Sequence, residues 1–238
     1  MIFHTTCDEL YFYRFYESFW KSIKENNPTA NFSLNYVGSE NAEILEFCKN
    51  NNIILSTEEI TLVELKNKFN LSTDNDVLGY YSLCRWKSIP IVNENVIVCD
   101  VDILAINKID IDLVDELLNK HQVVNITRIK PSGLPGGMMS IALSKAVTGA
   151  VKKMADDHCR LLTDSIAIGE DVYVRDFIYQ NLDVYELNGK VLDLSKPKYT
   201  TNGEWFVFAK GGQGENSVKK LKRLYDNLEI LKNNKLIE

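Results

Sequence analysis

The N-terminal half of the sequence alternates between short apolar segments of strand character and longer segments with helical periodicity. Strands that alternate with helices in this way predict a mostly parallel sheet with helices on both faces. In such a sheet, ligands bind at the carboxyl ends of the strands. We expect strands at 2–6, 31–37 and 53–55, and helices at 10–23, 41–49 and 79–89, the first ended by Asn26-Asn27-Pro28 and the last by Pro90.

The C-terminal half continues the alternation, and 238 residues suffice for one α/β domain with a proper core. The basic segment 217–235 has a leucine stripe at helical spacing. It is either a docked closing helix or a helix that lies on a membrane surface. We expect the remaining helices at 112–120, 145–157 and 171–180, and strands at 96–99, 123–127, 138–143 and 205–208.

Composition excludes several classes of protein. The net charge of −6 argues against a nucleic-acid binder, which presents excess Lys and Arg to phosphates. Five cysteines, an odd number without CxxC spacing, favour reduced cytoplasmic thiols over disulfides or a zinc site. The chain has neither a signal-peptide pattern nor the run of roughly 20 apolar residues that a spanning helix needs.

An acidic pair ends the most apolar predicted strand, where Val96-Ile97-Val98-Cys99 runs into Asp100-Val101-Asp102. Partly buried carboxylates are costly unless a cation or hydrogen bonds compensate them. Side chains at positions i and i+2 of an extended segment point to the same side, and a turn there can bring both onto one ion. Carboxylate oxygens select Mg²⁺ or Mn²⁺, whose open positions accept waters and substrate phosphates.

The acidic pair also fits two alternatives that stay open. It could be an exposed turn after a strand. It could also belong to a phosphatase of the haloacid-dehalogenase type, in which the first Asp is a nucleophile. Those enzymes carry the motif on their first strand, with Thr or Val two residues after the second Asp. Here that position is Leu104, and the motif lies near residue 100.

The segment 79–86, Gly-Tyr-Tyr-Ser-Leu-Cys-Arg-Trp, together with 96–102, resembles GT-A glycosyltransferases, especially those of family 8. In that family a helix with an Arg precedes an apolar strand that ends in the metal-binding Asp-x-Asp. The segments 3–11 and 22–28 are similar to the family's opening strand, nucleotide-binding loop and first helix. The resemblance implies one GT-A domain over 1–238, with a nucleotide-binding half at 1–104, a donor-sugar and acceptor half at 105–214, and a C-terminal helix at 215–238.

The same resemblance assigns the nucleotide-binding residues. Thr6 and Asp8 would contact base and ribose, Tyr11 would stack on the base, and Arg85 would reach the diphosphate or donor sugar. Asp8 could instead be only a helix N-cap, and Tyr11 only a core residue. Asp100, Val101 and Asp102 would bind the sugar nucleotide, and the carboxylates of Asp100 and Asp102 would also be the ligands of Mn²⁺ or Mg²⁺.

Three further segments match the family more loosely. In Leu134-Pro-Gly-Gly-Met, the glycines Gly136 and Gly137 would let the donor sugar approach the backbone. Glu170 and Asp171 would face the donor sugar and acceptor as the catalytic pair. Near the C-terminus, Lys210 and Gly211 would hold the diphosphate.

One position departs from the family pattern. Phe208 takes the place of a His that usually completes the metal site, which puts metal affinity and activity in question. Glu215 or Asn216 would be the replacement ligand.

The resemblance therefore implies a metal-dependent enzyme that transfers a hexose from a nucleoside-diphosphate sugar, with a UDP-sugar favoured. The acceptor is an unidentified glycan, lipid or protein, and family 8 enzymes retain the anomeric configuration. The alternative is a GT-A-like domain that binds sugar nucleotide or glycan with weak or no turnover. A sugar-phosphate nucleotidyltransferase would need a Gly-rich basic loop after the first strand, and residues 6–10 are not one.

Overall fold

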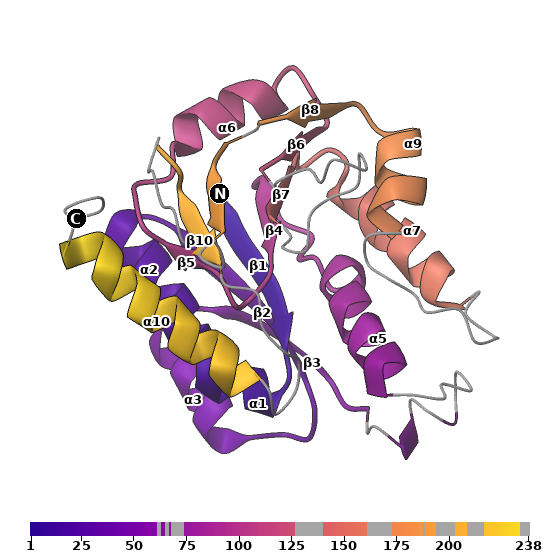
Figure 1. Cartoon of the computed structure of the whole chain (residues 1–238). Coiled ribbons are helices and arrows are strands. Elements are labelled where there is room, and N and C mark those ends of the chain that lie inside the picture. Colours follow the sequence, from indigo (N-terminus) through magenta and orange to yellow (C-terminus); the bar gives the residue numbers. More distant parts are fainter. Residues whose placement is uncertain are drawn as a thin grey trace.

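The structure is a computed structural model of the chain (Figure 1). It describes residues 1–60, 63–64, 67, 74–126, 140–160, 173–187, 189–193, 203–208 and 217–233.

A seven-stranded sheet with the order β3-β2-β1-β4-β7-β6-β8 forms the centre of the fold. β7 pairs antiparallel with both of its neighbours, and the remaining pairs are parallel. The sheet is therefore mixed and mostly parallel, as predicted. The strands are β1 (Ile2–Cys7), β2 (Asn31–Val37), β3 (Ile54–Glu58), β4 (Val96–Cys99), β6 (Val123–Asn125), β7 (Ser140–Leu143) and β8 (Val184–Glu186).

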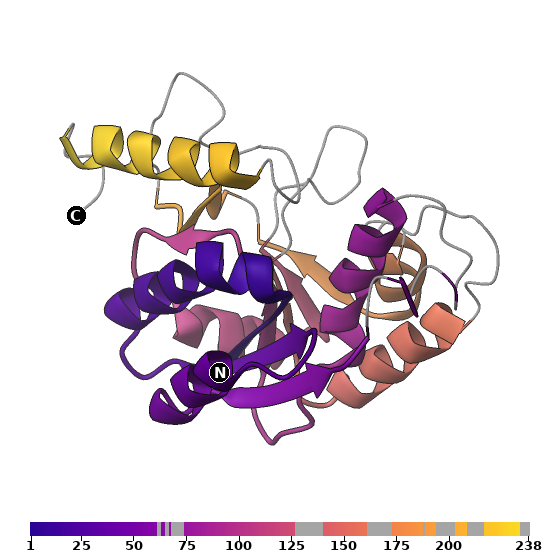
Figure 2. The same ribbon diagram turned by 90° about the horizontal axis from the view of Figure 1, so that it is seen from below.

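Helices cover both faces of this sheet (Figures 1 and 2). One face carries α1 (Glu9–Tyr11), the π-helical turn η1 (Phe12–Tyr16), α2 (Glu17–Asn26), α3 (Ala42–Asn50) and α6 (Ile111–Leu118). The opposite face carries α5 (Asp74–Lys87), α7 (Thr148–Arg160), the π-helical turn η2 (Val174–Ile178) and α9 (Tyr179–Asn181).

The central strands are apolar because both of their faces are buried. Phe3 and Ile97 enter the core under α2, whereas Ile2, Val96 and Val98 enter the core under α5 and α7. Successive side chains of a strand point to opposite faces, so β1 and β4 serve two cores at once. This double burial explains why the sequence shows a continuous apolar run rather than an alternating one.

A second, small sheet joins segments that are far apart in the chain. It consists of β5 (Leu104–Ala105), β10 (Phe206–Phe208) and β9 (Val191–Asp193), in that order. β5 follows β4 by a short loop, and the Ala105 backbone N–H donates to Ser22 Oγ of α2 at 3.0 Å. The small sheet thereby holds the far end of the loop that carries the acidic pair.

The C-terminal helix α10 (Ser217–Asn233) lies along the outside of α1 and α2 (Figures 1 and 2). Leu224 is 1% exposed, and Leu221 packs against the core that includes Phe12 and Phe19. Leucines at this spacing share one face of a helix, and Leu221 and Leu224 dock that face of α10 against the domain. No helix among the described residues is both long and apolar enough to cross a membrane.

The structure differs from the predicted elements in several respects. Three elements have other bounds than predicted: β3 runs on to Glu58 instead of ending at 55, α5 begins at Asp74 instead of 79, and α7 spans Thr148–Arg160 instead of 145–157. The first predicted helix contains the π-helical turn η1, and the helix predicted at 171–180 is largely the π-helical turn η2 in its described part. The strand predicted at 123–127 ends earlier, at Asn125. The strands β5, β8 and β9, of two or three residues each, were not predicted.

Candidate functional site

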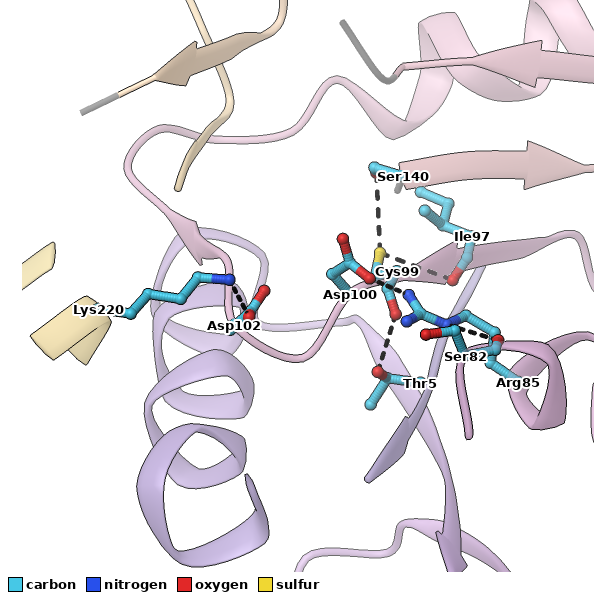
Figure 3. A network of polar contacts seen from close by, with 9 residues as sticks. All are labelled: Thr5, Ser82, Arg85, Ile97, Cys99, Asp100, Asp102, Ser140 and Lys220. Atoms are coloured by element: carbon cyan, nitrogen blue, oxygen red, sulfur yellow. Dashed lines mark hydrogen bonds and ion pairs between the residues drawn. The ribbon is translucent and has the colours of Figure 1, made fainter. Parts of the chain in front are cut away.

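The acidic pair lies in the loop that joins β4 to β5 (Figure 3). Thr5 of the neighbouring strand β1 donates its hydroxyl to the Cys99 carbonyl at 2.8 Å and fixes the start of this loop. Val101 and Ile103, at 6% and 0% exposure, point into the core. Asp100 and Asp102, which alternate with these two anchors, are left beside the carboxyl end of the central strand.

Asp100 is paired with Arg85 of α5. Arg85 Nη1 donates to Asp100 Oδ1, and the side chains of Arg85 and Asp100 are 8% and 17% exposed. Arg85 Nε also donates to the Ser82 carbonyl at 3.2 Å, which orients the guanidinium within its own helix. The Arg85 that the resemblance places at the diphosphate is thus in direct contact with the first acid of the motif.

His4 of β1 is hydrogen-bonded to the backbone of Arg85. Its Nε2–H donates to the Arg85 carbonyl at 2.8 Å, so Nδ1 of the neutral ring accepts from the Ser33 hydroxyl at 3.1 Å. Desolvation by complete burial lowers the pKa of His4 to about 3. The hydrogen bond to the Arg85 carbonyl opposes this shift, and the charges of Arg85 and Lys152 add to it. The ring is therefore neutral at physiological pH.

Asp102 is paired with a different cation, Lys220 of α10. Lys220 Nζ donates to Asp102 Oδ2, and the two side chains are 15% and 12% exposed. In Figure 3, Arg85 and Lys220 approach the loop from opposite sides. Each acid of the motif therefore has its own protein cation.

The two carboxylates fit a divalent cation by their chemistry. Their oxygens are hard ligands, and a cationic group already contacts one oxygen of each acid, which shows that this loop attracts positive charge. Within the described ranges, no cluster of three or more His, Cys, Asp and Glu side chains could hold a metal.

The residues expected at the nucleotide lie at the end of β1 and the start of α1. Thr6 is 6% exposed, and its Oγ1 has no hydrogen-bond partner among the described residues. Asp8 caps α1 by accepting the Tyr11 backbone N–H at 2.8 Å, and burial raises its pKa. Tyr11 is half-buried against Phe15, with ring centroids 5.3 Å apart. Asp8 is thus an N-cap and Tyr11 packs on the core, whereas Thr6 keeps a buried hydroxyl without a described partner.

Six predicted site residues lie outside the described residues: Gly136, Gly137, Glu170, Asp171, Lys210 and Gly211. The proposed replacement ligands Glu215 and Asn216 lie outside them too. Ser140 is the first described residue after Gly136 and Gly137. It pairs with Cys99, which precedes Asp100. Phe208, at the predicted histidine position, is 3% exposed and belongs to the core.

Lys220 is a site residue that was not predicted from the sequence. The pair it forms spans 118 positions, so no local motif could reveal it. One signal was present: Lys220 lies four residues before Leu224, and this spacing places it on the docked face of α10. The adjacent Lys219 is exposed.

Comparisons with known proteins agree on the fold. The order of strands, the single antiparallel strand and the flanking helices are those of the GT-A fold of nucleotide-sugar glycosyltransferases, which confirms the predicted fold class. The galactosyltransferase LgtC, solved with donor and acceptor sugar analogues, is similar with a TM-score of 0.63 and 11% identity over 97% of this chain and 96% of that one.

An active-site mutant of LgtC gives a TM-score of 0.58 with 12% identity, over 97% of this chain and 96% of that one. The apo form of the glycosyltransferase GlyE of Streptococcus pneumoniae gives 0.53 with 12% identity, over 82% of this chain and 46% of that one. No protein-family model and no curated protein sequence matches the chain. At these identities the likeness establishes the fold, and the activity has to be argued from the site.

Proposed function

We propose that this chain is a metal-dependent glycosyltransferase that moves a hexose from a nucleoside-diphosphate sugar, most readily a UDP-sugar, to a glycan, lipid or protein acceptor. The observation that carries the proposal is the partly buried pair Asp100 and Asp102 at the carboxyl end of the central strand of a GT-A sheet. Ligands of open α/β sheets bind at this edge. The buried, unpaired thiols fit a reducing compartment, so we place the reaction in the cytoplasm.

The two carboxylates would hold Mn²⁺ or Mg²⁺, and that ion would neutralise the charge that develops on the leaving diphosphate. Arg85 would contribute its guanidinium on the α5 side, where the Ser82 carbonyl orients the guanidinium and His4 anchors the Arg85 backbone carbonyl. Preorganised charge of this kind stabilises a transition state without reorganisation during the reaction. Thr6 would offer its buried hydroxyl to the nucleotide, with Asp8 and Tyr11 beside it.

The remaining roles are carried over from the family resemblance. Gly136 and Gly137 would line the donor sugar, and Lys210 and Gly211 would bind the diphosphate. Glu170 or Asp171 would steady the oxocarbenium-like donor carbon or position the acceptor hydroxyl. Retention of the anomeric configuration follows only from the analogy with family 8.

The test measures release of nucleoside diphosphate from a panel of UDP- and GDP-sugars with and without Mn²⁺. The wild type should release it only with the metal, and Asp102→Asn should reduce the rate by about 100-fold or more, the usual effect of removing one electrostatic group. Asp112→Asn, which removes an exposed acid from α6, is the matched control and should keep the wild-type rate.

Thermal shift on the same proteins separates the two functional classes. Stabilisation by a nucleotide sugar without any release of nucleoside diphosphate would favour a binding domain, the alternative motivated by Phe208. If no nucleotide sugar stabilises the wild type with or without Mn²⁺, both the transferase and the sugar-nucleotide-binding domain are refuted.

A further inference from the structure

The ion pair between Lys220 and Asp102 connects the C-terminal helix to the acidic loop of the site. Asp102 is 9% exposed as a whole residue, and the Lys220 side chain is 15% exposed. Among the described residues, Asp102 is the only polar partner of the Lys220 ammonium. The pair is therefore neither a solvated surface contact nor part of a wider network on α10.

The position of Lys220 is set by the packing of α10. Leu221 and Leu224 are docked on the core, and Tyr225 of the same helix contacts Ser18 Oγ of α2 through its hydroxyl. The adjacent Lys219 is exposed to solvent. The docked helix thus delivers one lysine, and not its neighbour, to the acidic loop.

A divalent cation on Asp102 and the ammonium of Lys220 cannot share the place that the ammonium now takes. Both are positive, and like charges at contact distance in a partly buried site repel strongly. Lysine has a flexible four-carbon stem and three rotatable donors, so its head group can move while the helix backbone stays docked. Binding of a metal at the Asp102 oxygen that Lys220 contacts therefore requires the Lys220 head group to leave.

Resting on the proposed function, the geometry points to Lys220 as a movable cation of the donor site. In the metal-free protein it neutralises Asp102, and it releases this carboxylate when a divalent cation binds. Its ammonium would then be free to contact the diphosphate of a bound nucleotide, because the docked helix α10 keeps Lys220 anchored beside Asp102. Lys220 thus competes with the metal and cooperates with the nucleotide.

Competition with the metal and contact with the diphosphate predict opposite effects of removing the Lys220 charge on the affinities for Mn²⁺ and for UDP. Without nucleotide, Lys220→Gln removes the competitor, so the affinity for Mn²⁺ measured by titration with electron paramagnetic resonance should rise on the order of tenfold, the effect of losing one charge-assisted hydrogen bond. In saturating Mn²⁺, the same variant should bind UDP about tenfold more weakly by calorimetry, because the diphosphate loses a charge-assisted partner. Lys219→Gln removes the same charge one residue away and should match the wild type in both titrations.

Equal affinity of Lys220→Gln and Lys219→Gln for Mn²⁺ would overturn the competition. Equal affinity of the two variants for UDP would overturn the contact with the diphosphate.

A second measurement needs no variant, in case Lys220→Gln fails to fold. The wild type is acetylated briefly with an amine-reactive ester, and mass spectrometry reads the modification of Lys219 and Lys220. Mn²⁺ alone should increase the modification of Lys220 several-fold, and Mn²⁺ with UDP should suppress it again, while Lys219 stays constant. An unchanged rate at Lys220 on addition of Mn²⁺ overturns the proposal.

The two proposals fail separately. If Mn²⁺ exposes Lys220 but no nucleoside diphosphate is ever released from a sugar nucleotide, the transferase activity is refuted and the competition at Asp102 stands.

Discussion

Acid should destabilise the fold through His4, the histidine that holds the carbonyl of Arg85. Its ring is completely buried, and the neutral form satisfies both ring nitrogens through Arg85 and Ser33. The Ser33 hydroxyl can turn to accept a second ring proton, but the positive charge on the ring would still be desolvated. Burial accordingly lowers the pKa of His4 from 6.5 to about 3.

The sign of the pH dependence follows from proton linkage. Between the folded and unfolded pKa values, the unfolded chain binds a proton that the folded chain does not, so the stability that His4 contributes is lost as the pH falls below 6.5 toward about 3. Each unit of pH within that window costs about 1.4 kcal/mol, and integration from pH 7 to pH 4.5 gives about 2.5 kcal/mol.

Urea unfolding at these two pH values tests the effect. The wild type should lose about 2.5 kcal/mol more stability between them than His4→Gln, whose amide can still donate to the Arg85 carbonyl but does not titrate. Carboxylates that titrate in the same range affect both proteins alike and cancel in the difference. Equal losses in the two proteins would mean that His4 does not stay neutral in the fold and would refute the reasoning.

Three more measurements follow from buried groups. Thr6→Val removes a buried hydroxyl without a described partner, so it should stabilise the fold to urea by about 1 kcal/mol and weaken UDP binding. Leu224→Ala should cost about 2–5 kcal/mol in the same assay, because Leu224 is 1% exposed on the docked face of α10. Burial raises the pKa of Cys99 to about 12 and that of Cys48 to about 11, and all five thiols are buried, so Ellman's reagent at pH 8 should react with none in the native protein and with all in urea.

Most of the main sheet was predictable from the sequence, because β1, β2 and the helices that follow them are long enough to show a period, whereas the three-residue strand β8 was not predicted. β2 has the predicted bounds Asn31–Val37, and α2 ends at Asn26, where the breaker cluster begins. The helix predicted from residue 41 begins at Ala42 because Asn41 caps it and accepts the Glu43 backbone N–H at 3.0 Å. Such local signals act within a few residues and need no knowledge of the fold.

The small sheet and the partners of the acids were not predictable in this way. β5 and β9 are two and three residues long, and β10 joins them only through pairing between distant segments. Val101 and Ile103 alternate with the two acids and are buried, so the sequence pattern correctly indicates that the acids point away from the core. That Lys220 is the partner of Asp102 depends on where α10 docks. The sequence therefore indicated where charge would gather and left open which cations would balance it.

The two acids of the loop are held by two separate parts of the fold, Asp100 by α5 and Asp102 by α10. Asp100 is held through Arg85, and Arg85 through His4, so this half of the site depends on the buried contact between α5 and β1. Asp102 is held through Lys220, so the second half depends on the docking of α10. Protonation of His4 should therefore disturb the Asp100 half first, whereas a divalent cation should act first on the Asp102 half. Since the acids are close in sequence but their cations come from opposite sides, the site can change its charge at Asp102 while Arg85 stays fixed at Asp100.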